Sequence, residues 1–163
     1  MQTNSPRISR PGREPGLPFR RRLRGESGAA IVEFALILPF LCLIVVLMLD
    51  FGRAFNYWVS TTHLASEGAR LAAVDSAPGG DLQAYIRNKG GTAELRDGGT
   101  RWISDPLEVC VNPDGDEVGD PVEVTVSTDY QWLPILGLAT TTIHGSATMR
   151  REVAATNVSS GCG

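Results

Sequence analysis

An apolar run from Ala29 to Leu49, which contains one formal charge at Glu33, constrains this chain more than any other feature. About twenty helical residues, each rising 1.5 Å, are enough to cross the hydrocarbon core of a bilayer. A secretory signal has a shorter apolar region that is closed by a small-residue cleavage site, and no convincing A-x-A site follows this run. We therefore predict a membrane-spanning helix that stays in the product.

The charges are divided unevenly along the chain. Seven Arg and two Glu give residues 1–28 a net charge of +5, which leaves −8 for residues 29–163 within the total of −3. The first segment is rich in Pro, Gly and Arg and cannot bury enough apolar surface to fold, so we predict a disordered basic leader. A nucleic-acid-binding arm is another interpretation, but a basic segment directly before an apolar helix favours a topological role. The positive-inside rule then places the N-terminus in the cytoplasm and residues after 50 outside the membrane.

The helical pattern continues past the apolar run. Phe51, Phe55 and Val59 recur at helical spacing, and alanines between residues 65 and 73 continue an apolar stripe that should pack on the rest of the chain. A single helix from about residue 29 to about residue 74 would be roughly 70 Å long. Pro39 inside it should cause a kink within the bilayer, and the Pro-Gly-Gly segment 78–80 should end the helical region.

The remaining residues predict a small sheet. Segments 107–112, 121–130 and 140–152 alternate apolar and polar side chains and are rich in Val and Thr, which is typical of strands. Segment 81–91 should hold one or two helical turns, and Asn-Pro-Asp-Gly at 112–115 is a strong turn sequence. The fold class that we predict is α+β, with a long N-terminal pilin-like helix and a small antiparallel sheet packed on its distal half.

The predicted organisation has five parts: a basic disordered leader (1–28), a transmembrane helix (29–50), its extracytoplasmic continuation (51–76), a small α+β extracytoplasmic domain (77–152) and a flexible tail (153–163).

The position of Glu33 is explained if the chain is cut after Gly28. Ala29 then becomes the first residue and Glu33 the fifth, which is the pattern of type IV prepilins, whereas a cut after Gly25 would put Ala30 at the fifth position. A glycine at the cut leaves the backbone accessible to a protease at the membrane face. An acid within a membrane segment needs a partner, and the new amine of Ala29 on a neighbouring subunit would supply the opposite charge. The alternative is that Glu33 lies at the interfacial edge, close enough to the headgroups to stay hydrated.

The N-terminal half also resembles the TadE-like family of minor pilins (pseudopilins), which belongs to the tight-adherence (Flp, type IVb) branch of type IV pili. The residues that carry the resemblance are Gly28, Val32-Glu33-Phe34-Ala35, Pro39, Phe51-Gly52-Arg53 and Glu67-Gly68-Ala69-Arg70, and the likeness is strong over residues 24–74.

This resemblance implies a minor pseudopilin that a prepilin peptidase processes and that takes part in pilus assembly. The partners that it implies are that peptidase, other pilins and pseudopilins, the inner-membrane assembly platform and the lipid bilayer. The protein would lie in the bacterial cytoplasmic membrane as a single-pass protein, with incorporation into a surface pilus as a further possibility.

Two groups in the distal part are candidates for structural sites. Cys110 and Cys162 would both face an oxidising compartment and could form a disulfide, or both could remain thiols. Asp114, Asp116 and Asp120 provide oxygen ligands at spacings that suit calcium, but the closing Glu of an EF-hand loop is missing. A solvated acidic turn is the simpler interpretation of this loop.

The sequence contains no phosphate-binding glycine loop, no paired catalytic carboxylates and no Ser-His-Asp order, and its two histidines have no ligands at metal-binding spacing. We therefore expect no enzyme activity, no cofactor, no metal centre and no nucleic-acid partner. The alternative to a pseudopilin is an uncleaved single-pass signal-anchored protein that displays an extracytoplasmic binding module.

Overall fold

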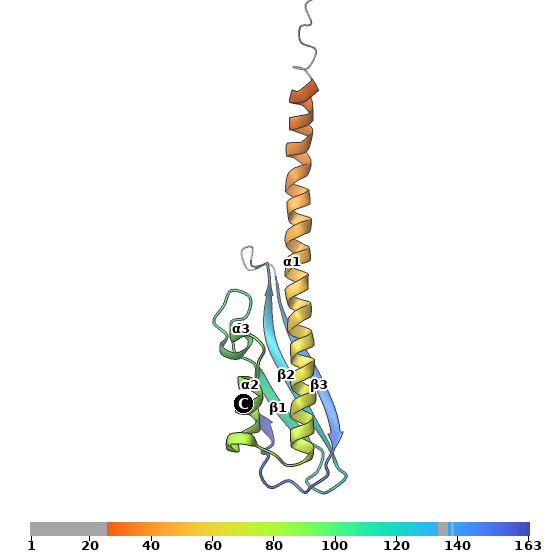
Figure 1. Cartoon of the computed structure of the whole chain (residues 1–163), viewed down its shortest axis with the longest axis vertical. Helices are drawn as coiled ribbons and strands as arrows, with labels where there is room; N and C mark the ends of the chain where they lie inside the picture. Colours follow the sequence, from red (N-terminus) through yellow and green to blue (C-terminus); the bar gives the residue numbers. More distant parts are fainter. Residues whose placement is uncertain (1–25, 134–136, 138) are drawn as a thin grey trace, which may run out of the picture. The chain divides into compact units, whose positions relative to one another are not determined.

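A computed structural model describes residues 26–133, 137 and 139–163 (Figure 1). All but the last three residues of the predicted leader, 1–28, lie outside the described part of the chain. The chain forms two compact units, residues 1–41 and 42–163, and the boundary between them lies within helix α1 (Glu26–Ala73).

Helix α1 ends in a defined capping motif. The amide of Ser76 donates to the carbonyl of Leu71 at 2.9 Å, and the amide of Asp75 donates to the carbonyl of Ala72 at 3.2 Å. These two bonds are those of a Schellman motif, in which the residue after the helix adopts the left-handed conformation. Asp75 fills that position with φ of 49°, since Asp tolerates positive φ better than most residues.

Three short helical segments follow: η1 (Pro78–Gly80), α2 (Leu82–Asn88) and α3 (Ala93–Asp97). Their N-termini are fixed by local chemistry, because the side chain of Asp81 accepts from the amide of Ala84 and that of Thr92 accepts from the amide of Leu95. Helix α2 lies within the predicted segment 81–91, whereas α3 was not expected.

The sheet has four antiparallel strands: β1 (Glu108–Pro113), β2 (Pro121–Trp132), β3 (Ala139–Arg150) and β4 (Gly161–Cys162), in the order β3-β2-β1-β4. The three longer strands match the predicted segments. The predicted fold class, a long N-terminal apolar helix followed by an antiparallel sheet that contacts it, is confirmed. The fourth strand brings residues 161–162, within the expected flexible tail, alongside β1.

Within the second unit, α1 contacts the sheet through small residues. Ala65, Ala69 and Ala72 are fully buried, and they face a core that includes the inward valines of β2, Val122, Val124 and Val126. Two glycines allow the backbones to approach closely. A Cβ on Gly68 would lie 2.9 Å from Val124 Cγ1, and a Cβ on Gly145 of β3 would lie 2.5 Å from the amide nitrogen of Thr62.

The predicted apolar stripe is correct for the alanines and wrong for its aromatic part. Phe51 and Phe55 are exposed, while Ala54 and Tyr57 are the residues that face the sheet at this level. The reason is geometric: side chains separated by three or four residues share a helix face, and Ala54, Tyr57, Thr61 and Ala65 form one such row, which is adjacent to the row of Phe51 and Phe55.

Candidate functional site

The first half of α1 presents an apolar surface without any partner in the described chain. Every residue from Gly28 to Leu49 is exposed, and the helix is long and apolar enough to cross a membrane. Gly28 and Ala29, the predicted processing site, lie in the first turn of α1, and among the described residues no atom beyond the adjoining helix backbone lies within 4 Å of a Cβ placed on Gly28. Glu33 lies one turn further along this apolar surface. These residues are therefore accessible to an enzyme, a lipid or another subunit.

Pro39 lies inside α1, and the helix continues through it. Because proline has no amide proton, one backbone hydrogen bond of the helix cannot form at this position. The kink that the sequence indicates at Pro39 stays a prediction.

At the end of the apolar run, Asp50 is buried rather than exposed at a membrane surface. Its Oδ1 accepts a hydrogen bond of 2.6 Å from the hydroxyl of Tyr130, and its Oδ2 accepts one of 2.9 Å from the amide of Leu133. Burial raises the pKa of the Tyr130 phenol, and its bond to Asp50 raises the pKa further. The phenol therefore remains a donor at physiological pH. In the sequence Asp50 is only the first charged residue after the apolar run, and no local pattern indicates this contact.

Aromatic rings surround this contact. The rings of Tyr57 and Tyr130 lie 5.6 Å apart, and Trp132 meets Tyr130 edge-on at 5.1 Å. The guanidinium of Arg53 lies 4.4 Å from the centre of the Trp102 ring, which is a favourable cation–π distance. The hydroxyl of Tyr57 donates to the carboxylate of Glu94. These side chains attach the end of the sheet near Trp132 to α1.

The end of α1 is bound to the C-terminal segment through the carboxylate of Asp75. This carboxylate accepts hydrogen bonds of 2.9 to 3.0 Å from the amides of Thr156, Asn157 and Val158 and one of 2.6 Å from the hydroxyl of Thr156. The Thr156 hydroxyl and the three amides hold the pKa of Asp75 well below its usual range, despite the opposing effect of burial. Residues 153–163, which we expected to be a flexible tail, thus contain a segment bound to α1.

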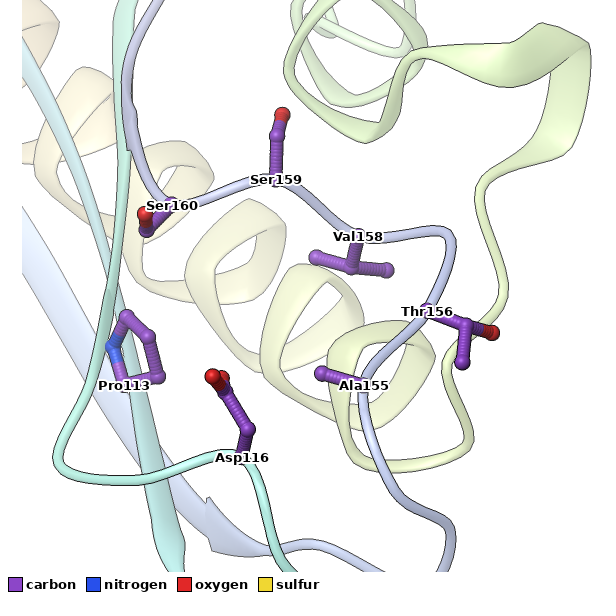
Figure 2. A pocket seen from close by; sticks show the side chains of 7 residues that line it. All are labelled: Pro113, Asp116, Ala155, Thr156, Val158, Ser159 and Ser160. Atoms are coloured by element: carbon purple, nitrogen blue, oxygen red, sulfur yellow. The ribbon is translucent and has the colours of Figure 1, made fainter.

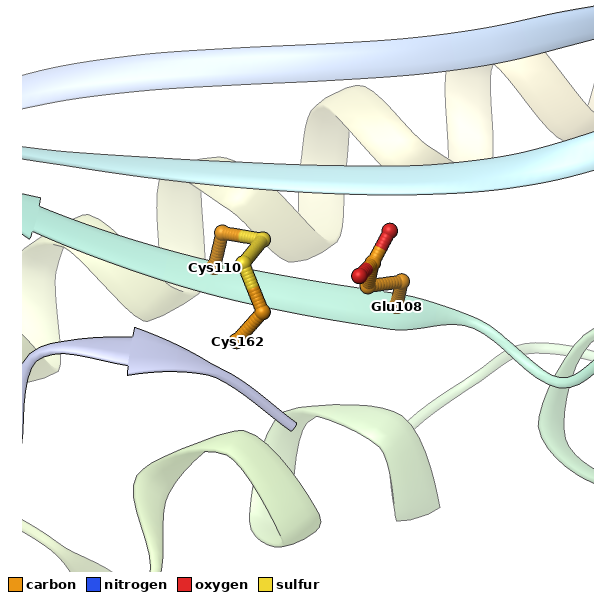
Figure 3. Close-up of side chains that lie close together, drawn as sticks. All are labelled: Glu108, Cys110 and Cys162. Atoms are coloured by element: carbon orange, nitrogen blue, oxygen red, sulfur yellow. A yellow bond between two sulfur atoms is a disulfide. The ribbon is translucent and has the colours of Figure 1, made fainter.

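Cys110 and Cys162, the candidate disulfide pair, are joined by a bond of 2.00 Å that links β1 to β4 (Figure 3). Glu108 lies beside this disulfide and forms with it the one acid–cysteine group of metal-ligand size among the described residues. Metal binding requires a thiolate, and both sulfurs are committed to the disulfide. The two cysteines therefore form a covalent cross-link, and this group is not a metal centre.

The acidic loop between β1 and β2 is held by two arginines. Arg151 Nε donates to the carbonyl of Gly115 at 3.1 Å, and Arg150 Nη1 donates to the carbonyl of Gly119 at 2.9 Å. A calcium ion in this loop would need such carbonyl oxygens.

The three candidate ligands, Asp114, Asp116 and Asp120, share this loop but, over the described ranges, do not form a three-ligand group. The carboxylate of Asp120 accepts from the amide of Glu117 at 3.0 Å. Asp116 instead lines an open pocket with residues 155, 156 and 158–160 of the C-terminal segment (Figure 2). The pocket wall is formed by backbone, hydroxyl and small apolar groups, without convergent charges.

The architecture is that of a protein with one helix of membrane-spanning length and a small antiparallel sheet packed on the second half of that helix. Residues 28–70 match the family model described as TadE-like protein, which confirms, over this segment, the resemblance seen in the sequence. The match includes Gly28, Glu33 and Pro39 and the α1 face that contacts the sheet, but it ends before the sheet begins. Neither the curated proteins nor the solved structures gave a match.

The match of residues 28–70 to the TadE-like family implies a role in the tight-adherence (Tad) pilus system and an association with its machinery. Proteins of this family are generally non-enzymatic. The long apolar helix is consistent with a single membrane span.

Proposed function

We propose that this protein is a minor pseudopilin of a tight-adherence pilus, cut after Gly28 by a prepilin peptidase and then taken into the pilus assembly. One observation carries the proposal: an exposed apolar half-helix begins at a glycine and contains a single acid five residues later. A surface of this kind is unstable in water, because each exposed apolar side chain costs about 1.5–3 kcal/mol relative to burial. Lipid supports the helix before assembly, and neighbouring helices support it afterwards.

Glu33 provides the specific contact in this proposal. An unpaired carboxylate in an apolar environment is costly, and an opposite charge at hydrogen-bond distance recovers much of that cost. Cleavage after Gly28 creates a positive amine on Ala29, and in a staggered array of helices the amine of one subunit can reach Glu33 of the next. Before cleavage this amine does not exist, so processing would be a condition for assembly.

The distal sheet supports a minor rather than a major position. It covers α1 along the row that contains Ala54, Ala65 and Ala72, so this face is not available to other helices. A subunit with one blocked face fits the tip, the base or an occasional position of a helical filament. The N-terminus would lie in the cytoplasm and residues after 50 outside, where a disulfide between Cys110 and Cys162 can persist.

The first test is the intact mass and N-terminal sequence of the protein extracted from membranes of its native host. A chain that begins at Ala29 supports processing. Gly28→Ile should block cleavage, and Gly25→Ile is the matched control because it changes a glycine of the leader without touching the cut. Retention of the leader in the wild-type protein, in cells with an active prepilin peptidase, would instead favour the uncleaved anchored binding module.

The second test concerns assembly. Glu33→Gln should leave membrane insertion and cleavage intact but reduce co-purification with other pilins. Glu67→Gln is the matched control, since Glu67 is an exposed acid of the same helix outside the apolar run. Unchanged co-purification and piliation with Glu33→Gln would remove the charge-pairing part of the proposal.

A further inference from the structure

Three exposed aromatic side chains lie on α1 immediately after the apolar run. Phe51, Phe55 and Trp58 are 64%, 54% and 49% exposed, and their spacing of four and three residues puts them on one face of the helix. The rings of Phe55 and Trp58 are in contact range, with 5.6 Å between their centres. None of the three takes part in the core beneath the sheet.

The same helix face becomes polar directly beyond these rings. Thr62 and Ser66 continue the row, and their hydroxyls bond back to the carbonyls of Trp58 and Thr62, each at 2.9 Å. On the other side, the row begins in the exposed apolar residues up to Leu49. The face therefore passes from aliphatic to aromatic to hydroxyl side chains over a few turns, which is the order of environments from hydrocarbon through headgroups to water.

Asp50 does not conflict with a deeper membrane position. Because Tyr130 and Leu133 satisfy both of its oxygens, this carboxylate does not require a hydrated position at the end of the span. A helix of the thirty residues 29–58 is roughly 45 Å long, and a bilayer with its headgroup regions is about 40–45 Å thick. The aromatic side chains thus stand where the second headgroup layer would be.

We propose that Phe51, Phe55 and Trp58 lie in the outer headgroup region of the bilayer and set the depth at which the protein is held. The occupant of this surface is lipid, because aromatic rings are enriched at the membrane interface and the surface continues an apolar membrane segment. Tyr130 and Leu133, which bond to Asp50 directly before Phe51, then lie at the inner edge of this headgroup region. The inference rests on the membrane insertion of the proposed function.

A second copy of the chain seated on these three side chains alone would have too small an interface. Three aromatic side chains that are about half exposed offer roughly 330 Å², whereas a stable interface needs about 800 Å² per partner. The neighbouring Asn56 and Thr62 do not enlarge the apolar area.

The test measures the depth of Trp58 in liposomes. The full chain, with Trp102→Phe and Trp132→Phe so that Trp58 is the sole tryptophan, is reconstituted at high lipid-to-protein ratio in phosphatidylcholine brominated either near the headgroup or near the methyl end of its acyl chains. We expect loss of Trp58 emission that is larger with the shallow bromines than with the deep ones. If the double variant does not fold, the difference in emission between wild type and Trp58→Phe provides the same comparison.

Two variants on a background without native tryptophans separate this inference from membrane insertion. Phe40→Trp should be quenched most by the deep bromines, and Ser66→Trp, on the same face as Trp58 but two turns further on, should not be quenched. Quenching of Phe40→Trp without quenching of Trp58 overturns the proposal while the membrane span stands. Loss of quenching at both positions means that insertion itself fails. Trp58 quenching that appears only after dilution into more lipid would assign the surface to a second copy and overturn the proposal too.

Discussion

Replacement of Asp75 by Gly should release the C-terminal segment from the end of α1. The change removes the carboxylate that binds Thr156, Asn157 and Val158. Gly is the right substitute because Asp75 has φ of 49°, a conformation that Gly adopts without the strain that Ala would add. The helix cap is therefore kept, and the effect reports the carboxylate alone.

The burial of the donors determines the size of this effect. Val158 is buried, so its amide cannot recover a bond to water and its loss should cost about 1–3 kcal/mol. Thr156 and Asn157 are exposed and can bind water, which reduces their cost to about 0.5–1.5 kcal/mol each. Relief of the left-handed strain at residue 75 returns about 1 kcal/mol. The central values give a net loss of about 3 kcal/mol, which corresponds to roughly a 150-fold increase in opening of this segment.

Hydrogen exchange of the amides of residues 156–158, in the full chain in mild detergent, measures this opening directly. Asp114→Gly is the control, since Asp114 is an exposed acid of the β1–β2 loop. Asp75→Asn should give an intermediate result because it keeps one acceptor oxygen. Unchanged exchange at Val158 in Asp75→Gly would show that the carboxylate does not hold the segment and would refute the reasoning.

Three further predictions concern the same unit. The pKa of Asp75 is lowered in the folded state, so the stabilisation by its carboxylate is present above the unfolded pKa of about 3.9 and is lost as the pH falls below that value. Hydrogen exchange at residues 156–158, corrected for intrinsic rates, should therefore rise with acidification. The Asp75→Asn variant should lack this rise. Cys162→Ser opens a cross-link between residues 52 apart and should lower the free energy of unfolding by up to about 4 kcal/mol, seen as a lower urea midpoint; an unchanged midpoint would contradict it. Gly145→Ala places a methyl 2.5 Å from the Thr62 nitrogen and should cost about 1–3 kcal/mol by the same assay, whereas Ser146→Ala, at an exposed position, should be neutral.

Much of the secondary structure follows from local pattern. Alternating apolar and polar residues in segments 107–112 and 121–130 predict strands, because successive side chains of a strand point to opposite faces of the sheet and only one face is buried. The observed β2 buries Val122, Val124 and Val126 in this alternation. The long helix also follows from local sequence, since the run from Ala29 to Leu49 has one formal charge and one proline. The candidate processing residues, Gly28 and Ala29, follow from the same apolar run, because only their position in the sequence relative to that run and to Glu33 defines them.

The tertiary contacts could not be predicted in this way. Asp50 and Asp75 read as ordinary helix-flanking acids, yet each accepts bonds from residues about 80 positions away. Strand β4 is two residues long and has no pattern of its own; it forms because the disulfide and the Asp75 contact bring residues 156–162 to the edge of β1. Phe51 and Phe55 face away from the sheet because of how α1 is rotated about its own axis. The spacing of apolar residues does not define this rotation when two adjacent rows of the helix are both apolar.

The sequence by itself determined that this protein has one membrane-length helix with an acid at its fifth residue after a glycine, because hydrophobicity and order along a chain need no folding to act on a membrane or a protease. The face of that helix that the sheet covers depends on contacts that form only in the folded protein. Close packing explains the choice: the row that contains Ala54, Ala65 and Ala72, with Gly145 opposite, lets the sheet approach the helix backbone. Tyr57 is the aromatic residue of α1 that this row buries, whereas Phe51, Phe55 and Trp58 remain outside, where lipid can contact them.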